Sequence, residues 1–158
     1  MTVKAILAAK RGDVVTMEPT ADLTAAAKLL AAHRIGAVVI LGADRRMVGI
    51  LSERDIVRAL AERCPAALKE TVGQVMTRNV VSCGEDETIR SIMERMTAGK
   101  FRHMPVVVAG RLAGIISIGD VVKLRAQRSD RSGKWRTNVI IREIILCVGE
   151  CILSLGHI

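Results

Sequence analysis

Aromatic residues are almost absent from this chain: its 158 residues include one Phe, one Trp and no Tyr. Because 50% of the residues are nevertheless hydrophobic, the chain can form a core, but Val, Ile, Leu, Ala and Met must fill it. The shortage of aromatics also leaves no platform on which the bases of a single-stranded nucleic acid could stack. At this length, one compact body or two half-domains are expected.

Long hydrophobic runs and cysteine frameworks are missing as well. No stretch of about 18 uncharged apolar residues occurs, so we do not expect a membrane span. Residues 1–7 have the pattern of a short amphipathic helix and lack the long apolar region of a signal peptide. The four cysteines show no framework spacing, which indicates reduced thiols and a cytoplasmic protein. They are Cys64, Cys83, Cys147 and Cys151.

Motifs for catalysis are also lacking. The sequence has no nucleophile with a base nearby, no Walker or Rossmann glycine loop and no paired carboxylates. Cys147, Cys151 and His157 could be arranged around a metal ion, but cysteines four residues apart in an apolar helix more often serve packing. We therefore expect a protein that is not an enzyme, with no catalytic residues, no metal and no required cofactor.

Positive charge is in excess, with a formal net charge of +8. About half of this excess comes from the tail after Val122, where seven Lys and Arg residues face three Asp and Glu residues. A basic surface alone gives non-specific, salt-sensitive binding to nucleic acids. Because no helix-turn-helix or zinc-finger pattern accompanies the charge, specific nucleic-acid recognition is not expected.

The most informative feature that is present is an internal repeat. The segment Gly49–Val57, GILSERDIV, returns 65 residues later at Gly114–Val122 as GIISIGDVV. Each copy holds a Gly, two aliphatic residues, a Ser, and an Asp three residues after the Ser. Since the polar Ser and Asp are kept together with the apolar pattern, the repeat indicates two similar small-molecule sites related by internal symmetry.

The repeat extends upstream of this motif at an offset of 66 residues. Val15-Thr16 matches Val81-Ser82, and Ala37–Leu41 falls in register with His103–Val107. Each unit spans about 45 residues, which is too short to bury an adequate core alone, so the two units should pack on each other.

Both units predict the same order of elements: strand, helix, two strands of a hairpin, and helix. The first strands are short apolar segments, and the helices carry apolar residues at helical spacing. The expected first strands are 14–17 and 80–83. The apolar helix faces consist of Leu23, Ala26, Ala27 and Leu30 in the first unit and of Ile89, Ile92, Met93 and Met96 in the second. The hairpins pair 37–41 with 47–51 and 104–108 with 112–117. Asp55 and Asp120 then fall in the first turn of the last helix, where the helix dipole favours a carboxylate. The fold class is thus α/β (α+β), built from two β-α-β-β-α repeats.

This duplicated unit resembles the CBS domain, and residues 14–125 resemble a tandem CBS pair, or Bateman module. The resemblance rests on both Gly-aliphatic-aliphatic-Ser-x-x-Asp endings and on the segment Phe101–Val106, FRHMPV. Small stand-alone bacterial CBS-pair proteins are similar across most of the chain. The resemblance implies repeats packed about a pseudo-two-fold axis, clefts that bind adenosine nucleotides or related ligands, and a homodimer.

The resemblance implies two ligand sites, and the residue chemistry supports them. An ionised Asp can accept hydrogen bonds from two ribose hydroxyls, while a Ser hydroxyl and cationic side chains suit phosphate. One site would centre on Asp120, with Ile115, Ser117, Arg102 and His103, and with Leu23, Ile35 and Gly36 as the opposite wall. The other would centre on Asp55, with Ile50, Ser52 and Arg54, and with Ile89, Phe101 and Arg102 as its wall. Since the first repeat has Gly36-Ala37 where the second has Arg102-His103, the Asp120 site should be better equipped for phosphate.

Simpler interpretations of the same residues stay open. Asp55 and Asp120 are also suited to be helix caps or dipole partners, Ser52 and Ser117 to be caps, and Arg102 to be part of a solvated strand edge. The function that the resemblance implies is a regulatory module that senses AMP, ADP, ATP, S-adenosylmethionine or NAD and acts on a target protein. The alternatives are a structural dimerisation module with degenerate sites, and a protein that associates with nucleic acid through its basic tail.

The sequence departs from the resemblance near residue 126. Residues 128–134 read as a basic linker, and residues 138–155 have the wide apolar face of a helix buried against a partner subunit. We therefore expect an N-terminal helix at 1–13, repeats at 14–62 and 80–125 joined by a linker at 63–79, and an atypical segment at 126–158.

Overall fold

The computed structural model describes residues 2–10 and 13–124, and the expectations for the tail after residue 125 lie outside them. The described residues form two compact units. Unit 1 contains α1 (Val3–Ala9), α5 (Ile89–Ala98) and a helix at residues 118–124. Unit 2 contains β1 (Thr16–Met17), α2 (Leu23–His33), β2 (Ala37–Leu41), β3 (Met47–Ser52), α3 (Glu53–Arg63), the 3₁₀ helix η1 (Cys64–Lys69) and α4 (Val72–Val75).

One β-hairpin runs through both units. It consists of β4 (His103–Val108) and β5 (Arg111–Ser117), and its outer part, Pro105–Ile115, groups with unit 2. The strand ends nearest α5 and the helix at 118–124 belong to unit 1. The hairpin thereby carries His103 and Ser117, two residues of one predicted site, into the same unit.

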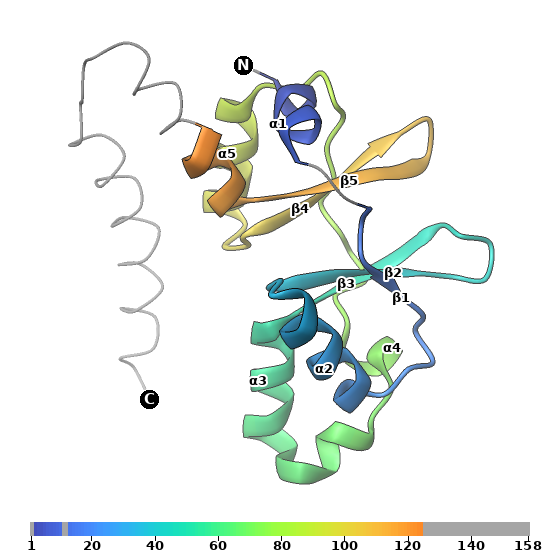
Figure 1. Cartoon of the computed structure of the whole chain (residues 1–158). Coiled ribbons are helices and arrows are strands. Elements are labelled where there is room, and N and C mark those ends of the chain that lie inside the picture. Colours follow the sequence, from blue (N-terminus) through green and yellow to red (C-terminus); the bar gives the residue numbers. More distant parts are fainter. Residues whose placement is uncertain (1, 11–12, 125–158) are drawn as a thin grey trace, which may run out of the picture. The chain divides into compact units, whose positions relative to one another are not determined.

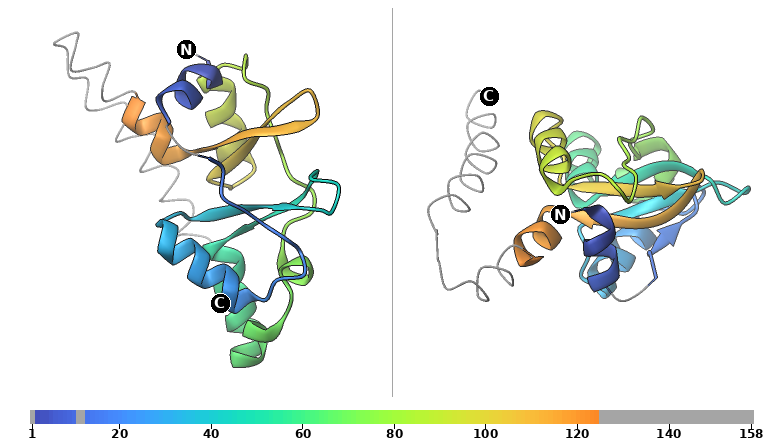
Figure 2. Two further views of the ribbon diagram at one scale, coloured as in Figure 1. Left: turned by 45° about the vertical axis from the view of Figure 1, so that its right-hand side comes forward. Right: turned by 90° about the horizontal axis from the view of Figure 1, so that it is seen from above.

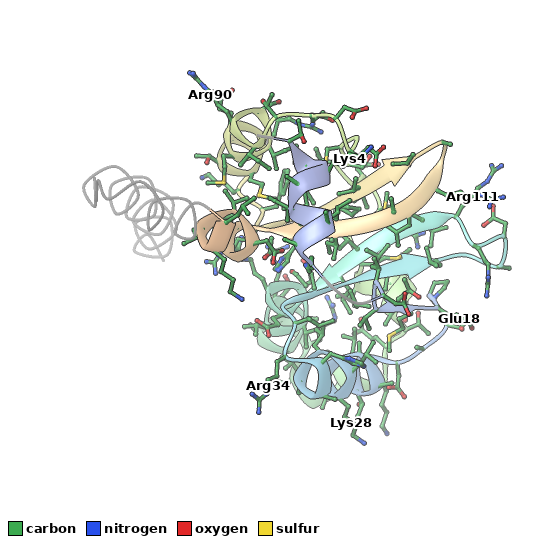
Figure 3. The ribbon with its side chains drawn as sticks, turned by 45° about the horizontal axis from the view of Figure 1, so that its top comes forward. Lys4, Glu18, Lys28, Arg34, Arg90 and Arg111 are labelled. Atoms are coloured by element: carbon green, nitrogen blue, oxygen red, sulfur yellow. The ribbon has the colours of Figure 1, made fainter. Side chains whose placement is uncertain are left out.

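A three-stranded sheet with two helices on it builds unit 2 (Figure 1). β1 pairs in parallel with β2, and β2 pairs antiparallel with β3. The side chains of Leu23, Val38 and Leu51 are completely buried between sheet and helices. Charged side chains on and just after α2, Lys28 and Arg34, point outward instead (Figure 3). The core of this unit is therefore aliphatic, as the composition predicts.

The helices α2 and α5 begin and end in the same way. Asp22 caps α2 by accepting a hydrogen bond from the Ala25 N–H, and Thr88 caps α5 through the Ser91 N–H. After the helices, Arg34 and Lys100 adopt left-handed backbone angles, with φ of 53° and 54°. Such a residue turns the chain out of a helix and into the following strand. The repeat of the sequence is thus a repeat of backbone conformation.

Each repeat also receives a short helix from elsewhere in the chain. In unit 2, α4 joins the start of α2 through the Val72 N–H to the Ala21 carbonyl, 2.7 Å. In unit 1, α1 is the dark blue helix at the N-terminal end of the chain (Figures 1 and 2), and its Val3 N–H donates to the carbonyl of Glu87, just before α5, at 3.0 Å. The N-terminal helix therefore completes the second repeat, and α4, inside the segment expected as a linker, completes the first. Each repeat is thus completed by a helix that lies before the other repeat in the sequence, and we call α1 and α4 the exchanged helices. Both begin with the same dipeptide, Thr2-Val3 and Thr71-Val72, which is the sequence signal of the exchange.

The expected elements are otherwise confirmed, except that both first strands are shorter than expected: of 14–17, only Thr16–Met17 forms a strand. Both hairpins, the helices and the mixed fold class are present as predicted. The first strand of the second repeat, however, shrinks to one parallel bridge between Cys83 and Val106. The cause is Pro105, which stands where the first repeat has Val39 and has no N–H to extend the ladder. Of the expected core positions, Ala27 and Met93 are only partly buried.

Candidate functional site

Both Ser-x-x-Asp motifs form the same cap at the start of a helix. In unit 2, Ser52 precedes α3, and its N–H and hydroxyl donate to Asp55 Oδ2 at 2.8 and 2.6 Å, while the Asp55 N–H donates back to Ser52 Oγ at 3.4 Å. In unit 1, the N–H and hydroxyl of Ser117 both donate to Asp120 Oδ2 at 2.8 Å, and the Asp120 N–H returns a bond of 3.2 Å. The capping interpretation is therefore correct for both pairs.

A second shared bond ties each motif to the start of its hairpin. The Glu53 N–H donates to the Gly36 carbonyl, and the Ile118 N–H donates to the Arg102 carbonyl, each at 3.1 Å. These bonds place residues 36 and 102 next to the first turn of the helices that carry Asp55 and Asp120. In unit 1, Arg102 and His103 are thereby held near Asp120, whereas unit 2 has glycine and alanine at the matching positions.

Lys10 is a residue of the unit 1 site that the sequence analysis missed. Its Nζ lies 2.9 Å from Asp120 Oδ2, although the two residues are 110 positions apart in the chain. The Asp120 side chain is 18% exposed and that of Lys10 is 41% exposed. For Asp55, the described part of the chain provides no ion pair. The repeated Thr-Val dipeptide could have pointed to Lys10. It indicates that α1 packs on the second repeat, and Lys10 follows directly after α1.

The environment of this cluster changes two pKa values in unit 1. For Asp120, burial raises the pKa, but the hydrogen bonds from Lys10 and Ser117 together with the Lys10 charge lower it further, so the net shift is downward. For His103, burial and the charges of Lys10 and Arg102 lower the pKa, against an opposing effect of Asp120. At neutral pH the site therefore presents an ionised carboxylate, a neutral imidazole and two cations.

The remaining predicted residues divide into core and surface. Leu23 and Ile89, the first residues of α2 and α5, are 0% and 3% exposed, so both side chains belong to the core. The half-buried ones are Ile35, Gly36, Ile50, Phe101 and Ile115, while Arg54 is exposed. Ile50 is also tied to the segment after α4, since its N–H and carbonyl bond to the Thr77 carbonyl and N–H at 3.0 and 2.9 Å.

Each predicted site draws its opposite wall from the other unit. What the structure brings together in unit 1 is Lys10, Arg102, His103, Ser117 and Asp120; in unit 2 it brings together Gly36, Ser52, Arg54 and Asp55. The contact of Leu23, Ile35 and Gly36 with a ligand at Asp120 stays a prediction. The same holds for Ile89, Phe101 and Arg102 with a ligand at Asp55.

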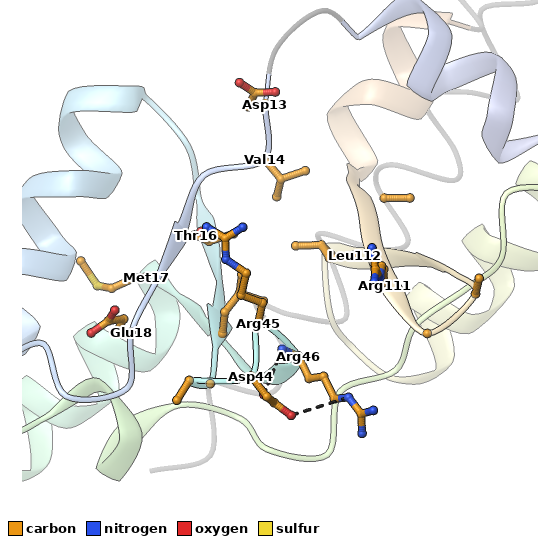
Figure 4. A pocket seen from close by; sticks show the side chains of 16 residues that line it. Asp13, Val14, Thr16, Met17, Glu18, Asp44, Arg45, Arg46, Arg111 and Leu112 are labelled. Atoms are coloured by element: carbon orange, nitrogen blue, oxygen red, sulfur yellow. Dashed lines mark hydrogen bonds and ion pairs between the residues drawn. The ribbon is translucent and has the colours of Figure 1, made fainter.

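An open hollow lies away from these residues, within unit 2. It has a volume of about 1730 Å³ and is lined by the turns of both hairpins and by the segment around β1 (Figure 4). Its charged lining consists of Arg45, Arg46 and Arg111 and of Asp13, Glu18 and Asp44. Because three cations face three carboxylates, and Arg46 already lies 3.6 Å from Asp44, the hollow has no charge preference that would select a ligand. None of the predicted site residues lines it.

Within the described residues, the chain shows neither a metal-binding cluster nor a membrane-spanning helix. Among them, no group of three His, Cys, Asp or Glu side chains is placed to hold a metal ion. In residues 2–10 and 13–124, no helix is both long enough and apolar enough to cross a membrane.

Comparison with known proteins identifies the repeat and its relatives. The structure of a CBS-domain containing protein from Agrobacterium tumefaciens is 51% identical with a TM-score of 0.77, over 79% of this chain and 99% of that one. A CBS domain protein from Pyrobaculum aerophilum, complexed with AMP, is 26% identical with a TM-score of 0.71, over 85% of this chain and 100% of that one. The CBS domain pair of protein MJ0100 was solved in complex with 5′-methylthioadenosine and S-adenosyl-L-methionine. It is 30% identical with a TM-score of 0.72, over 81% of this chain and 98% of that one.

Curated relatives are longer than the matched region. An uncharacterised 17.7 kDa protein of Acidianus ambivalens is 33% identical over 111 residues, which make up 70% of this chain and 66% of that protein. A Methanocaldococcus jannaschii protein is matched over 49% of its length, so the chain spans half to two thirds of these relatives. The family model of the CBS domain matches residues 3–62 and 72–127, and each match begins at one of the exchanged helices. The chain therefore belongs to the CBS-domain proteins and carries two copies of the domain in tandem.

Proposed function

We propose that this protein is a non-enzymatic regulatory module that binds an adenosine-containing ligand at the unit 1 site. The candidates are AMP, ADP, ATP, S-adenosylmethionine and NAD. Support comes from the CBS-pair structures with AMP or with S-adenosyl-L-methionine bound, which are 26% and 30% identical to this chain. Ligand binding regulates through its different affinity for two arrangements of the protein, so no chemical step is needed.

The observation that carries the proposal is the state of Asp120. Its Oδ2 holds the cap and Lys10, whereas in the described residues Oδ1 accepts no hydrogen bond. The carboxylate is partly exposed, and its lowered pKa keeps it ionised. Such an oxygen is suited to accept the adjacent hydroxyls of a ribose, and the neighbouring cations suit a charged 5′ substituent.

A melting screen tests the proposal. The full chain is heated with AMP, ADP, ATP, S-adenosylmethionine or NAD, because a ligand that binds only the folded protein raises its melting temperature by mass action. At a ligand concentration of 100 times Kd, the stabilisation is about 2.7 kcal/mol. We expect at least one of these compounds to raise the melting temperature.

Paired variants then locate the binding site. Asp120→Ala and Asp55→Ala each remove the carboxylate half of a capping box and leave the Ser that caps the helix, so both should lose about 1 kcal/mol of stability. Only Asp120→Ala should also abolish most of the ligand-induced shift. Equal losses of the shift in the two variants contradict the assignment to unit 1, and no shift with any of the five compounds favours a structural dimerisation module instead.

A further inference from the structure

Lys10 projects from a backbone that is fixed in unit 1. Its N–H donates to the carbonyls of Ile6 and Leu7 at 3.0 and 3.1 Å, which ends α1 at this residue. The start of α1 is held by hydrogen bonds to the carbonyls of Glu85 and Glu87. Val3 and Ile6 are buried, so packing holds the helix as well. The Lys10 ammonium therefore reaches Asp120 from a defined base, and the ion pair does not depend on a free chain end.

The charges at this site do not balance. Lys10 and Arg102 are cations, and one carboxylate, Asp120, stands beside them. His103 responds to both cations, since each contributes to the lowering of its pKa. The excess of positive charge is local: unit 2 has Gly36-Ala37 in place of Arg102-His103, and its cation Arg54 stands between two carboxylates in the chain, Glu53 and Asp55. An anion is thus favoured at the unit 1 site and a cation is disfavoured.

An ammonium group can serve two acceptors at once. It carries three N–H donors, and Lys10 directs one of them to Asp120 Oδ2. A ligand whose ribose bonds to Asp120 places its 5′ substituent within reach of the neighbouring cations, so Lys10 can keep the carboxylate in place and bind that substituent.

We propose that Lys10 is the residue that selects a 5′-phosphorylated adenosine, such as AMP, over adenosine and over the sulfonium cation of S-adenosylmethionine. This inference rests on the proposed function of the unit 1 site and names the ligand class. Lys10 acts together with Arg102 on the phosphate, and the N-terminal helix thereby becomes part of the ligand site of the second repeat.

Calorimetric titration of AMP, adenosine and S-adenosylmethionine tests the inference in the full chain and in Lys10→Met. Met keeps the length of the side chain and removes its charge. We expect the wild type to bind AMP at least about tenfold more tightly than adenosine, and Lys10→Met to lower the AMP affinity by about tenfold, the usual worth of a charge-assisted hydrogen bond. Adenosine affinity should stay within about twofold, and S-adenosylmethionine affinity should stay equal or rise.

Lys4→Met is the matched control. Lys4 lies on the same helix, and its Nζ is 3.4 Å from Glu85, so this variant removes the same charge and an ion pair without touching Asp120. It should keep the wild-type preference for AMP. Lys10→Arg retains the charge and should also keep most of that preference, which covers the case in which Lys10→Met fails to fold.

The outcomes separate the two claims. If adenosine and AMP bind but Lys10→Met leaves their affinity ratio unchanged, the role of Lys10 is overturned and the proposed function stands. If S-adenosylmethionine binds the wild type more tightly than AMP, the charge argument is overturned in the same way. If none of the three compounds binds but ADP, ATP or NAD raises the melting temperature, the selection of AMP is overturned and the proposed function stands. If the melting screen shows no shift with any of the five candidate ligands either, the proposed function itself fails.

Discussion

Asp120 shows how one side chain can cap a helix and still present a carboxylate oxygen for the ligand that we propose. Its Oδ2 accepts three bonds, from the Ser117 N–H, the Ser117 hydroxyl and Lys10 Nζ, which stabilise the start of a helix. Capping and the proposed ligand binding are therefore compatible, because the cap uses Oδ2 and leaves Oδ1 to accept hydrogen bonds from a ligand. The Ser-x-x-Asp pattern predicted both possibilities, but only the geometry shows that one oxygen carries the whole cap.

His103 should make stability depend on pH in a window near neutrality. Its pKa in the folded protein lies below its ordinary value of 6.5 because of burial and the charges of Lys10 and Arg102, against the opposing charge of Asp120. Below pH 6.5 the unfolded chain therefore binds the proton more readily than the folded protein, so stability is full above this pH and falls on acidification. We expect His103→Gln to flatten this decline.

Thermal melting between pH 7.5 and 5.5 measures the effect. The carboxylate of Asp120 does not interfere, since its pKa is lowered from 3.8 and its contribution is lost only below that value. His33→Gln is the control, because His33 is exposed at the end of α2, and this variant should keep the wild-type slope. A wild-type slope in His103→Gln contradicts the prediction.

At the scale of elements, periodicity and repetition predicted most of the fold. The helical faces around Leu23 and Ile89 and both hairpins follow from local spacing, which depends on nearby residues alone. Two features depend on distant partners and were not predicted. One is the attachment of α1 to the segment before α5 and of α4 to the segment before α2. The other is the Lys10–Asp120 pair, which depends on the position of α1. The short first strand of the second repeat could have been predicted from Pro105, because a proline has no N–H with which to extend the pairing of that strand.

Gly49 on β3 should be required for the packing of the segment around α4. A Cβ at this position would lie 2.4 Å from Met76 Sδ and 3.1 Å from the Thr77 carbonyl oxygen. Met76 can move, but Thr77 is held to Ile50 by two backbone hydrogen bonds. We expect Gly49→Ala to lower the free energy of unfolding by about 1–3 kcal/mol, the usual cost of overpacking.

Urea denaturation of Gly49→Ala and Gly84→Ala compares a crowded glycine with an open one. A Cβ on Gly84 meets no atom within 4 Å, so that variant should change the free energy of unfolding by less than about 0.5 kcal/mol. Similar stabilities of the two variants would show that the segment around Met76 adapts and that the close approach is not required.

At the scale of the whole molecule, net charge and specific binding have different sources. The cations of the unit 1 site, Lys10 and Arg102, lie in the described part of the chain, whereas much of the charge excess lies after Leu124. Removing residues 125–158 takes away six Lys and Arg and three Asp and Glu, so the net charge falls from +8 to +5. A truncation therefore distinguishes binding at the proposed ligand site from general attraction to polyanions.

We expect truncation after Leu124 to weaken non-specific binding to duplex DNA and to leave AMP binding within about twofold. Each lost contact to a phosphate lowers the slope of log affinity against log salt by about 0.9, so the salt dependence should become shallower. Fluorescence anisotropy with a random-sequence duplex between 50 and 200 mM salt measures both quantities. Because Lys10→Met removes only one charge and leaves the tail intact, it should alter AMP selectivity and scarcely change the DNA slope. If truncation instead abolished AMP binding while the DNA slope stayed unchanged, the tail would belong to the ligand site, and the basic charge would serve specific recognition.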